Sequence, residues 1–175
     1  YFHLDMAIRP VGFPYVLVDD PKLGLKNLEK IEKDFPQNKD KIRKVRNYLE
    51  RRTKSWYSST DETCKKLIEY GFKPIRIAGS YTEGINFMNA IVNLKDNGKM
   101  SYITNSPKHT LPFYEKLEEI FKKDLVEACP DIDKIYMVSG KMAQDSRNDI
   151  THNLEILHGG IHCMTAEVPD FDKIA

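Results

Sequence analysis

Near the N-terminus, apolar residues alternate with turn-forming residues and do not follow a helical period. Residues 4–11 and 15–18 predict two strands, joined by a turn at residues 10–14 that is rich in proline and glycine. We therefore expect a hairpin-like pair of strands ahead of the first helix.

A charged region follows at residues 22–54. Its apolar residues recur at helical spacing in 25–31 and again in 42–49, and Pro36 separates the two runs. This pattern predicts two short amphipathic helices. Because the charges are of both signs, they favour a solvated helical face over a substrate-binding surface.

Helix and strand signals alternate through the rest of the chain. Ser59 and Glu62 form a capping box and Gly71 stands at the expected stop, so a separate helix is predicted over 59–71. The hairpin turn predicted at 96–98 carries Asn-Gly. The other expected elements are strands at 72–78, 85–94, 100–104 and 135–138, and a long amphipathic helix over 113–125.

The final part of the chain has a weaker pattern. Residues 139–158 are polar and are typical of a long loop beside an active site, and a last strand is expected to hold Cys163. Taken together, the elements repeat the order strand, strand, helix, strand, without a close sequence repeat. We predict one α/β domain over residues 1–175, with the charged helices at about 22–54 as an insertion.

Composition and charge narrow the function classes. The chain has 175 residues, 41% of them hydrophobic, which suffices for one domain with a core. A formal net charge of +1 argues against a dedicated nucleic-acid binder. No apolar run approaches membrane-spanning length, so neither a nucleic acid nor a membrane is expected as a partner.

Three cysteines are present, and their spacing fits neither a zinc ribbon nor a disulfide framework. We expect reduced thiols, no metal site and a cytoplasmic location, with secretion left open if the chain is a processed piece. Cys64 and Cys129 lie on predicted helices and are interpreted as core residues. Cys163 alone follows a glycine pair and a histidine.

Cys163 and His3 are the candidate nucleophile and the candidate acid/base. A reactive thiol needs a histidine or a cation nearby to lower its pKa. Asp5 lies two residues from His3, so on a strand the two side chains share a face. Because His3 and Cys163 are at opposite ends of the sequence, a closed, propeller-like arrangement would bring them together.

These motifs resemble, in order, those of the guanidino-group-modifying enzymes, also called the pentein superfamily. The resemblance rests on His3-Leu4-Asp5, on the stretch 84–89 that leads into a hairpin, and on Gly159-Gly160-Ile161-His162-Cys163-Met164-Thr165. The superfamily includes arginine, agmatine and peptidylarginine deiminases and the amidinotransferases. The resemblance implies an α/β propeller of ββαβ modules, with about three of the five modules present.

The resemblance also implies roles for individual residues. Cys163 would attack the guanidinium carbon to form a covalent intermediate, and His3 would move protons to the leaving group and from water. Asp5 would hold the guanidinium, Asn86 would lie near the nucleophile, and Gly160 would let the backbone approach the substrate. No cofactor is implied.

The family also uses carboxylates from its first two modules, and the chain has no residues before Tyr1 that match them. We expect them from missing N-terminal modules or from another chain. The 160 positions between His3 and Cys163 place the chain nearer the peptidylarginine deiminases than the other deiminases.

The predicted function is deimination of arginine, peptidyl arginine or a related guanidine such as agmatine, with release of ammonia. Two alternatives stay open. The chain could be an amidinotransferase that moves the amidino group to an amine, or a non-catalytic regulatory or binding fragment of the same fold. A papain-like cysteine hydrolase is a weaker interpretation, because no orienting Asn or Asp partner can be placed for it.

Overall fold

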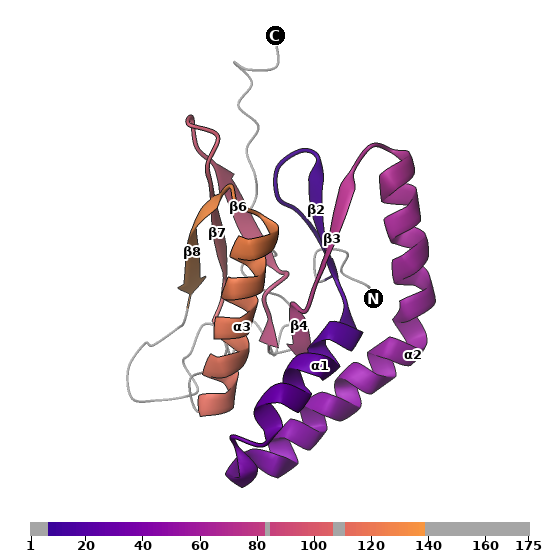
Figure 1. Ribbon diagram of the computed structural model, residues 1–175, viewed down its shortest axis with the longest axis vertical. Coiled ribbons are helices and arrows are strands. Elements are labelled where there is room, and N and C mark those ends of the chain that lie inside the picture. The colour runs from indigo at the N-terminus through magenta and orange to yellow at the C-terminus, as the bar shows by residue number, and fades with distance from the viewer. Residues whose placement is uncertain (1–6, 83–84, 107–110, 139–175) are drawn as a thin grey trace.

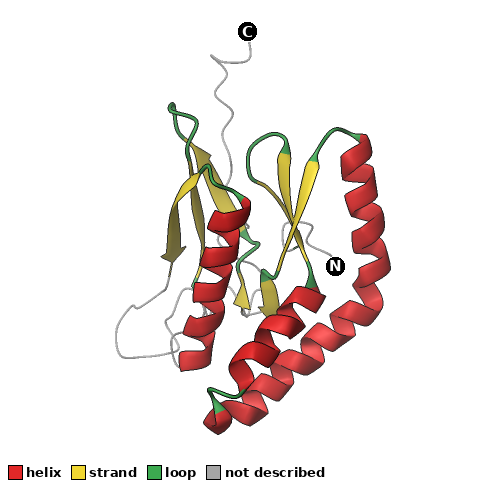
Figure 2. Cartoon of the chain, viewed as in Figure 1, coloured by secondary structure: helices red, strands yellow, loops and turns green. Residues whose placement is uncertain are grey.

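The computed structural model describes residues 7–82, 85–106 and 111–138, without the side chains of 56–59 (Figure 1). Within these ranges the chain is a mixed α/β structure and the sheets form no closed barrel (Figure 2). The elements are β1 (Ile8–Pro10), β2 (Tyr15–Asp19), α1 (Pro21–Glu32), the 3-10 helix η2 (Pro36–Asn38), α2 (Lys39–Glu69), β3 (Lys73–Ile77), β4 (Ser80–Thr82), β5 (Ile85–Asn86), β6 (Ala90–Leu94), β7 (Met100–Asn105), α3 (Pro112–Ala128) and β8 (Ile132–Val138).

Two three-stranded sheets have the same topology. In the first unit, β1 pairs antiparallel with β2, and β2 pairs parallel with β3 after the chain has passed through α1 and α2. In the second unit, β6 pairs antiparallel with β7, and β7 pairs parallel with β8 after α3. This confirms the recurring order strand, strand, helix, strand for two units. A small antiparallel pair, β4 and β5, connects them.

Helix α1 begins where its sequence favours a start. Asp20 is the N-cap, and its Oδ1 accepts a hydrogen bond of 2.9 Å from the backbone N–H of Lys22. Pro21 occupies the first turn, where its missing N–H costs nothing. The helix then packs against the first half of α2 through Leu28 and Ile31, both buried.

Helix α2 is continuous, so the prediction of a new helix at Ser59 is wrong. It runs from Lys39 to Glu69, and Figure 1 shows that it changes direction about half-way along. No glycine or proline interrupts these residues, so the helix has no local reason to end before Gly71. Its first half packs on α1, and its second half packs Cys64 against Val16 and Val18 of β2.

One large core joins the two units. Phe87, between β5 and β6, stacks on Phe121 of α3 with the ring centroids 4.8 Å apart. The buried Tyr102 hydroxyl donates a hydrogen bond of 2.8 Å to the carbonyl of Phe87. Cys129 is buried at the end of α3, so the interpretation of Cys64 and Cys129 as core residues is confirmed.

The predicted strand over 85–94 is instead two strands. Residues 87–89 form a turn between β5, which pairs with β4, and β6, which belongs to the second three-stranded sheet. In this turn the side chain of Asn86 accepts hydrogen bonds from the backbone of Met88 and Asn89. The predicted hairpin between β6 and β7 is confirmed, with Gly98 at a φ of +77°. The predicted loop at 139–158 and the strand holding Cys163 lie outside the described residues.

Candidate functional site

The polar side chains that could serve a site gather at the carboxyl ends of β2 and β3. Asp19 ends β2, and its backbone N–H donates a hydrogen bond of 2.8 Å to the carbonyl of Ala7. The described chain therefore enters β1 at this edge, two residues after the predicted substrate-binding Asp5. The carboxyl ends of open α/β sheets are common ligand sites, because the loops that leave the strands converge there.

Asp19 is a buried carboxylate with a full set of donors. The residue is 3% exposed, and its Oδ1 accepts hydrogen bonds of 2.8 Å from the backbone N–H groups of Gly79 and Ser80. Its Oδ2 lies 2.7 Å from Nη1 of Arg52. Burial raises the pKa of Asp19, while Arg52 and the two backbone donors oppose that rise. The carboxylate holds the end of β3 against β2.

Arg52 extends this contact to the long helix. Its Nη1 also lies 3.2 Å from the carbonyl of Ser80, and its guanidinium stacks over the ring of Tyr48 at 5.7 Å. Arg52 therefore ties the middle of α2 to the β3–β4 junction. Because an arginine of the chain already occupies Asp19, this carboxylate is not available to hold a substrate guanidinium.

Asp20 and Glu118, the other buried carboxylates among the described residues, are also occupied. Asp20 caps α1 and lies 3.4 Å from Nη1 of Arg76, which also pairs with Asp61. Glu118 accepts a hydrogen bond from Ser106 and pairs with Lys122. No buried carboxylate in the described part of the chain is therefore free to act as a guanidinium clamp.

Asn86 is the one predicted site residue within the described ranges. It is 5% exposed and lies on β5 directly opposite Ser80 of β4, next to the contacts of Asp19. Its Oδ1 accepts hydrogen bonds of 2.9 Å and 3.3 Å from the backbone N–H groups of Met88 and Asn89. Its Nδ2 is buried and has no hydrogen-bond partner among the described residues.

The turn after Asn86 is held from both units. Arg9 of β1 donates from Nε to the carbonyl of Met88 at 3.2 Å, and Thr104 of β7 donates to the carbonyl of Phe87 at 2.9 Å. Gly79 lets the side chain of Met88 pack closely against the backbone, because a Cβ at Gly79 would lie 2.4 Å from Sδ of Met88. The backbone around Asn86 is thus rigidly placed.

The other thiols in the described ranges are poor nucleophiles. Burial raises the pKa of Cys64, and it raises the pKa of Cys129 to about 11. A thiol with a raised pKa is protonated at neutral pH, so neither residue competes with Cys163 for the predicted role. No group of acidic, histidine and cysteine side chains in the described residues could hold a metal ion.

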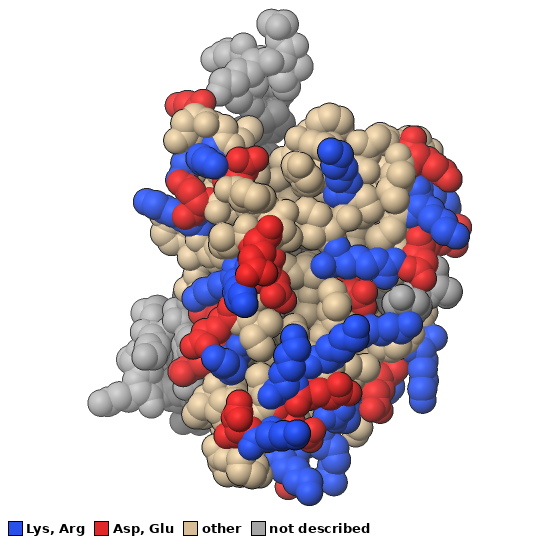
Figure 3. Space-filling model, viewed as in Figure 1, with Lys and Arg blue, Asp and Glu red and all other residues tan. Residues whose placement is uncertain are grey.

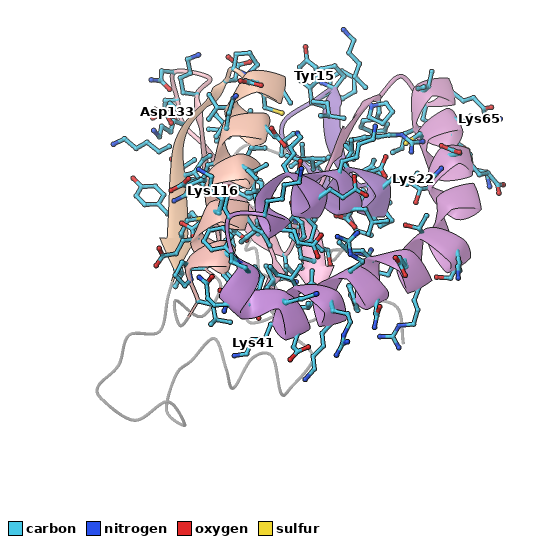
Figure 4. The ribbon with its side chains drawn as sticks, turned by 60° about the horizontal axis from the view of Figure 1, so that its bottom comes forward. Tyr15, Lys22, Lys41, Lys65, Lys116 and Asp133 are labelled. Atoms are coloured by element: carbon cyan, nitrogen blue, oxygen red, sulfur yellow. The ribbon has the colours of Figure 1, made fainter. Side chains whose placement is uncertain are left out.

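The outer face of the charged helices carries side chains of both signs. Lys22, Lys41 and Lys65 point outward (Figure 4), and Figure 3 shows lysines and arginines interspersed with acidic residues over the lower part of the molecule. A shallow pocket on α2 is lined by Lys44, Asn47, Glu50, Arg51 and Lys54. It contains no thiol and no histidine, so it lacks the pair of groups that the predicted deiminase chemistry needs. None of the helices in the described ranges has the length and apolar character to cross a bilayer.

His3, Asp5, Gly160 and Cys163 lie outside the described residues, so the structure leaves their mutual geometry untested. Sequence reasoning missed Asp19 and Arg52. Asp19 stands in a plain apolar strand, and Arg52 is one of many cations on its helix, so only their pairing distinguishes them. Comparisons with protein-family models, with curated proteins and with solved structures found no match.

Proposed function

We propose that the chain is part of a guanidine deiminase that acts on arginine or peptidyl arginine and releases ammonia. The observation that carries the proposal is the order of His3-Leu4-Asp5 and Gly159-Gly160-Ile161-His162-Cys163 along the chain. The two β-β-α-β units between these motifs support it, because a pentein-type propeller is built from such modules. In this proposal they are two blades of that propeller.

The chemistry needs a strong nucleophile and a reversible proton carrier. The Cys163 thiolate attacks the guanidinium carbon and forms a C–S bond. His3 gives a proton to one nitrogen, and ammonia leaves from the tetrahedral adduct. Water, which loses a proton to His3, then attacks the same carbon, the C–S bond breaks, and a ureido product leaves with the thiolate restored. The net reaction consumes one water and yields one ammonium per guanidinium.

Asp5 is the carboxylate that we assign to the guanidinium. A planar guanidinium with several N–H donors is best held by carboxylates in paired hydrogen bonds. The buried carboxylates Asp19, Asp20 and Glu118 already have cationic or hydroxyl partners within the chain. Within the described residues, no buried carboxylate is therefore left to share the guanidinium with Asp5.

The test is a turnover assay of the full-length protein with arginine, peptidyl arginine and agmatine. We expect ammonia and a ureido product without any added amine, and Cys163→Ala should lower the rate at least about a thousandfold, as loss of a nucleophile does. Cys64→Ala is the matched thiol control and should keep the activity, because Cys64 packs in a small apolar cluster.

Three results would contradict the proposal. Product that forms only with an acceptor amine would indicate an amidinotransferase. Full activity of Cys163→Ala, or no turnover of any guanidine by the full-length protein, would remove the covalent mechanism and favour a non-catalytic role.

A further inference from the structure

The side-chain amide of Asn86 has hydrogen-bond partners for its oxygen but none for its nitrogen among the described residues. Oδ1 accepts two backbone hydrogen bonds, from Met88 and Asn89. Nδ2 is buried and has no acceptor among the described residues. A buried donor without an acceptor is costly, so native structures retain few of them and those retained often have a functional reason.

The orientation of this amide is determined by its neighbours. Rotating the amide by 180° would place its NH2 group against two backbone N–H donors, where it could accept nothing. Nδ2 must therefore be the free end. The buried Oδ1 of Asn105 is also without a partner in the described residues, which means that these two amides do not satisfy each other.

The position of Asn86 connects this donor to the candidate site. Asn86 pairs with Ser80, whose backbone N–H is bound by Asp19 at the edge where the chain enters β1. Asn86 is held firmly there, since the following turn is bonded to both β1 and β7. A donor that is pre-oriented in this way can select a ligand with little loss of conformational freedom.

A guanidinium cannot be the ligand of Nδ2. All its polar atoms are N–H donors, so an amide nitrogen has nothing to donate to. The acceptors on an arginine-type substrate are instead the oxygens at its other end, in the α-carboxylate or in the peptide carbonyl. Agmatine carries no such oxygen.

We propose that Asn86 Nδ2 binds an acceptor oxygen on the main-chain end of the substrate, so the enzyme selects arginine and peptidyl arginine over decarboxylated guanidines. This inference rests on the proposed deiminase function. It assigns Asn86 to substrate selection and leaves the guanidinium to Asp5.

The experiment compares kcat/KM for arginine, an N-acyl-arginine amide and agmatine in the full-length protein and in Asn86→Asp. The aspartate keeps an oxygen for the N–H groups of Met88 and Asn89 and replaces only the free donor by an acceptor. We expect the ratio of kcat/KM for arginine to that for agmatine to fall by about 10-fold to 100-fold, as for other lost hydrogen bonds to a charged partner. The ratio for the N-acyl-arginine amide should fall less, because its carbonyl is neutral.

Asn97→Asp is the matched control. Asn97 makes the same kind of turn, in which its Oδ1 accepts the N–H of Lys99 at 3.0 Å, but it lies in the exposed β6–β7 hairpin. In Asn97→Asp the ratio of kcat/KM for arginine to that for agmatine should be unchanged. If Asn86→Asp does not fold, the affinities of arginine and agmatine for the Cys163→Ala protein, measured by calorimetry, replace it: tighter binding of arginine supports the proposal, and equal affinities overturn it.

The outcomes separate this inference from the deiminase proposal. Suppose that ammonia is released but Asn86→Asp lowers kcat/KM equally for all three substrates, or for none of them. The deiminase proposal is then supported, and Asn86 has only a structural role. If no guanidine is turned over by the full-length protein, both proposals fail together.

Discussion

The two β-β-α-β units share one strand topology and differ in the helices that cross between their parallel strands. In the first unit the crossover is a pair of helices, α1 and α2, and in the second it is α3 alone. The second half of α2 covers the face of the first sheet that carries Val16 and Val18. The described residues of the second unit hold no second helix of this kind, and Tyr136 and Val138 of β8 are 48% and 39% exposed.

This difference shows what the second crossover helix, α2, contributes to the first unit. A strand alternates its side chains between two faces, so a sheet that is covered on one face can expose the other. Helix α3 covers one face of the second sheet, and α1 together with α2 encloses the first sheet on both faces. The two crossover helices are therefore part of the first unit, and α2 also brings Arg52 to Asp19.

The largest expected effect tests whether the units are independent. Phe121→Ala removes the ring that packs on Phe87 and Tyr102, where the cores of both units meet. We expect the free energy of unfolding to fall by about 3–5 kcal/mol, as for other buried aromatic truncations. Urea unfolding followed by far-UV circular dichroism should keep a single transition. Val126→Ala, on the exposed side of the same helix, should change stability by less than about 0.5 kcal/mol.

Two separate transitions in the Phe121→Ala protein would contradict a shared core. In that case the first unit would unfold at the wild-type urea concentration, and only the second would be weakened.

An intermediate effect is expected where α2 meets the first sheet. Arg52→Ala leaves the carboxylate of Asp19 buried with only its two backbone donors, so we expect a loss of about 2–3 kcal/mol, somewhat below that of a fully buried pair. Arg43→Ala breaks the exposed pair with Asp40 and should cost less than about 0.5 kcal/mol. Thermal unfolding of both variants measures the difference, and equal melting temperatures would show that the buried contact contributes nothing.

The smallest expected effect compares the two sheets with one substitution. Val18→Thr places a hydroxyl in the cluster under α2, where the valine is 2% exposed, and should cost about 1–2 kcal/mol. Val138→Thr makes the same change on the uncovered sheet and should stay within about 0.5 kcal/mol. If the urea midpoints shift equally in the two variants, the coverage of the first sheet by α2 does not affect the stability cost of the substitution.

Local signals were the parts of the fold that could be predicted. The hairpin at Asn97 and Gly98, the turn near Gly12 and the amphipathic helix α3 depend on neighbouring residues, and the structure confirms each of them. The wrong predictions concern places where two local signals compete. The capping box at Ser59 does not start a helix, because α2 continues through it. The apolar run at 85–94 does not form one strand, because the side chain of Asn86 forms a turn with the backbone that follows it.

The sequence by itself determined the strand, strand, helix, strand order of the second unit, the turn near Gly12, and the burial of Cys64 and Cys129. These features follow from residue type and from spacing along the chain. Only the tertiary structure decided that Arg52 pairs with Asp19, that α2 covers a second sheet face, and that the amide of Asn86 has a free donor. Such contacts join residues far apart in sequence or depend on which groups burial leaves without water, and no local pattern specifies either.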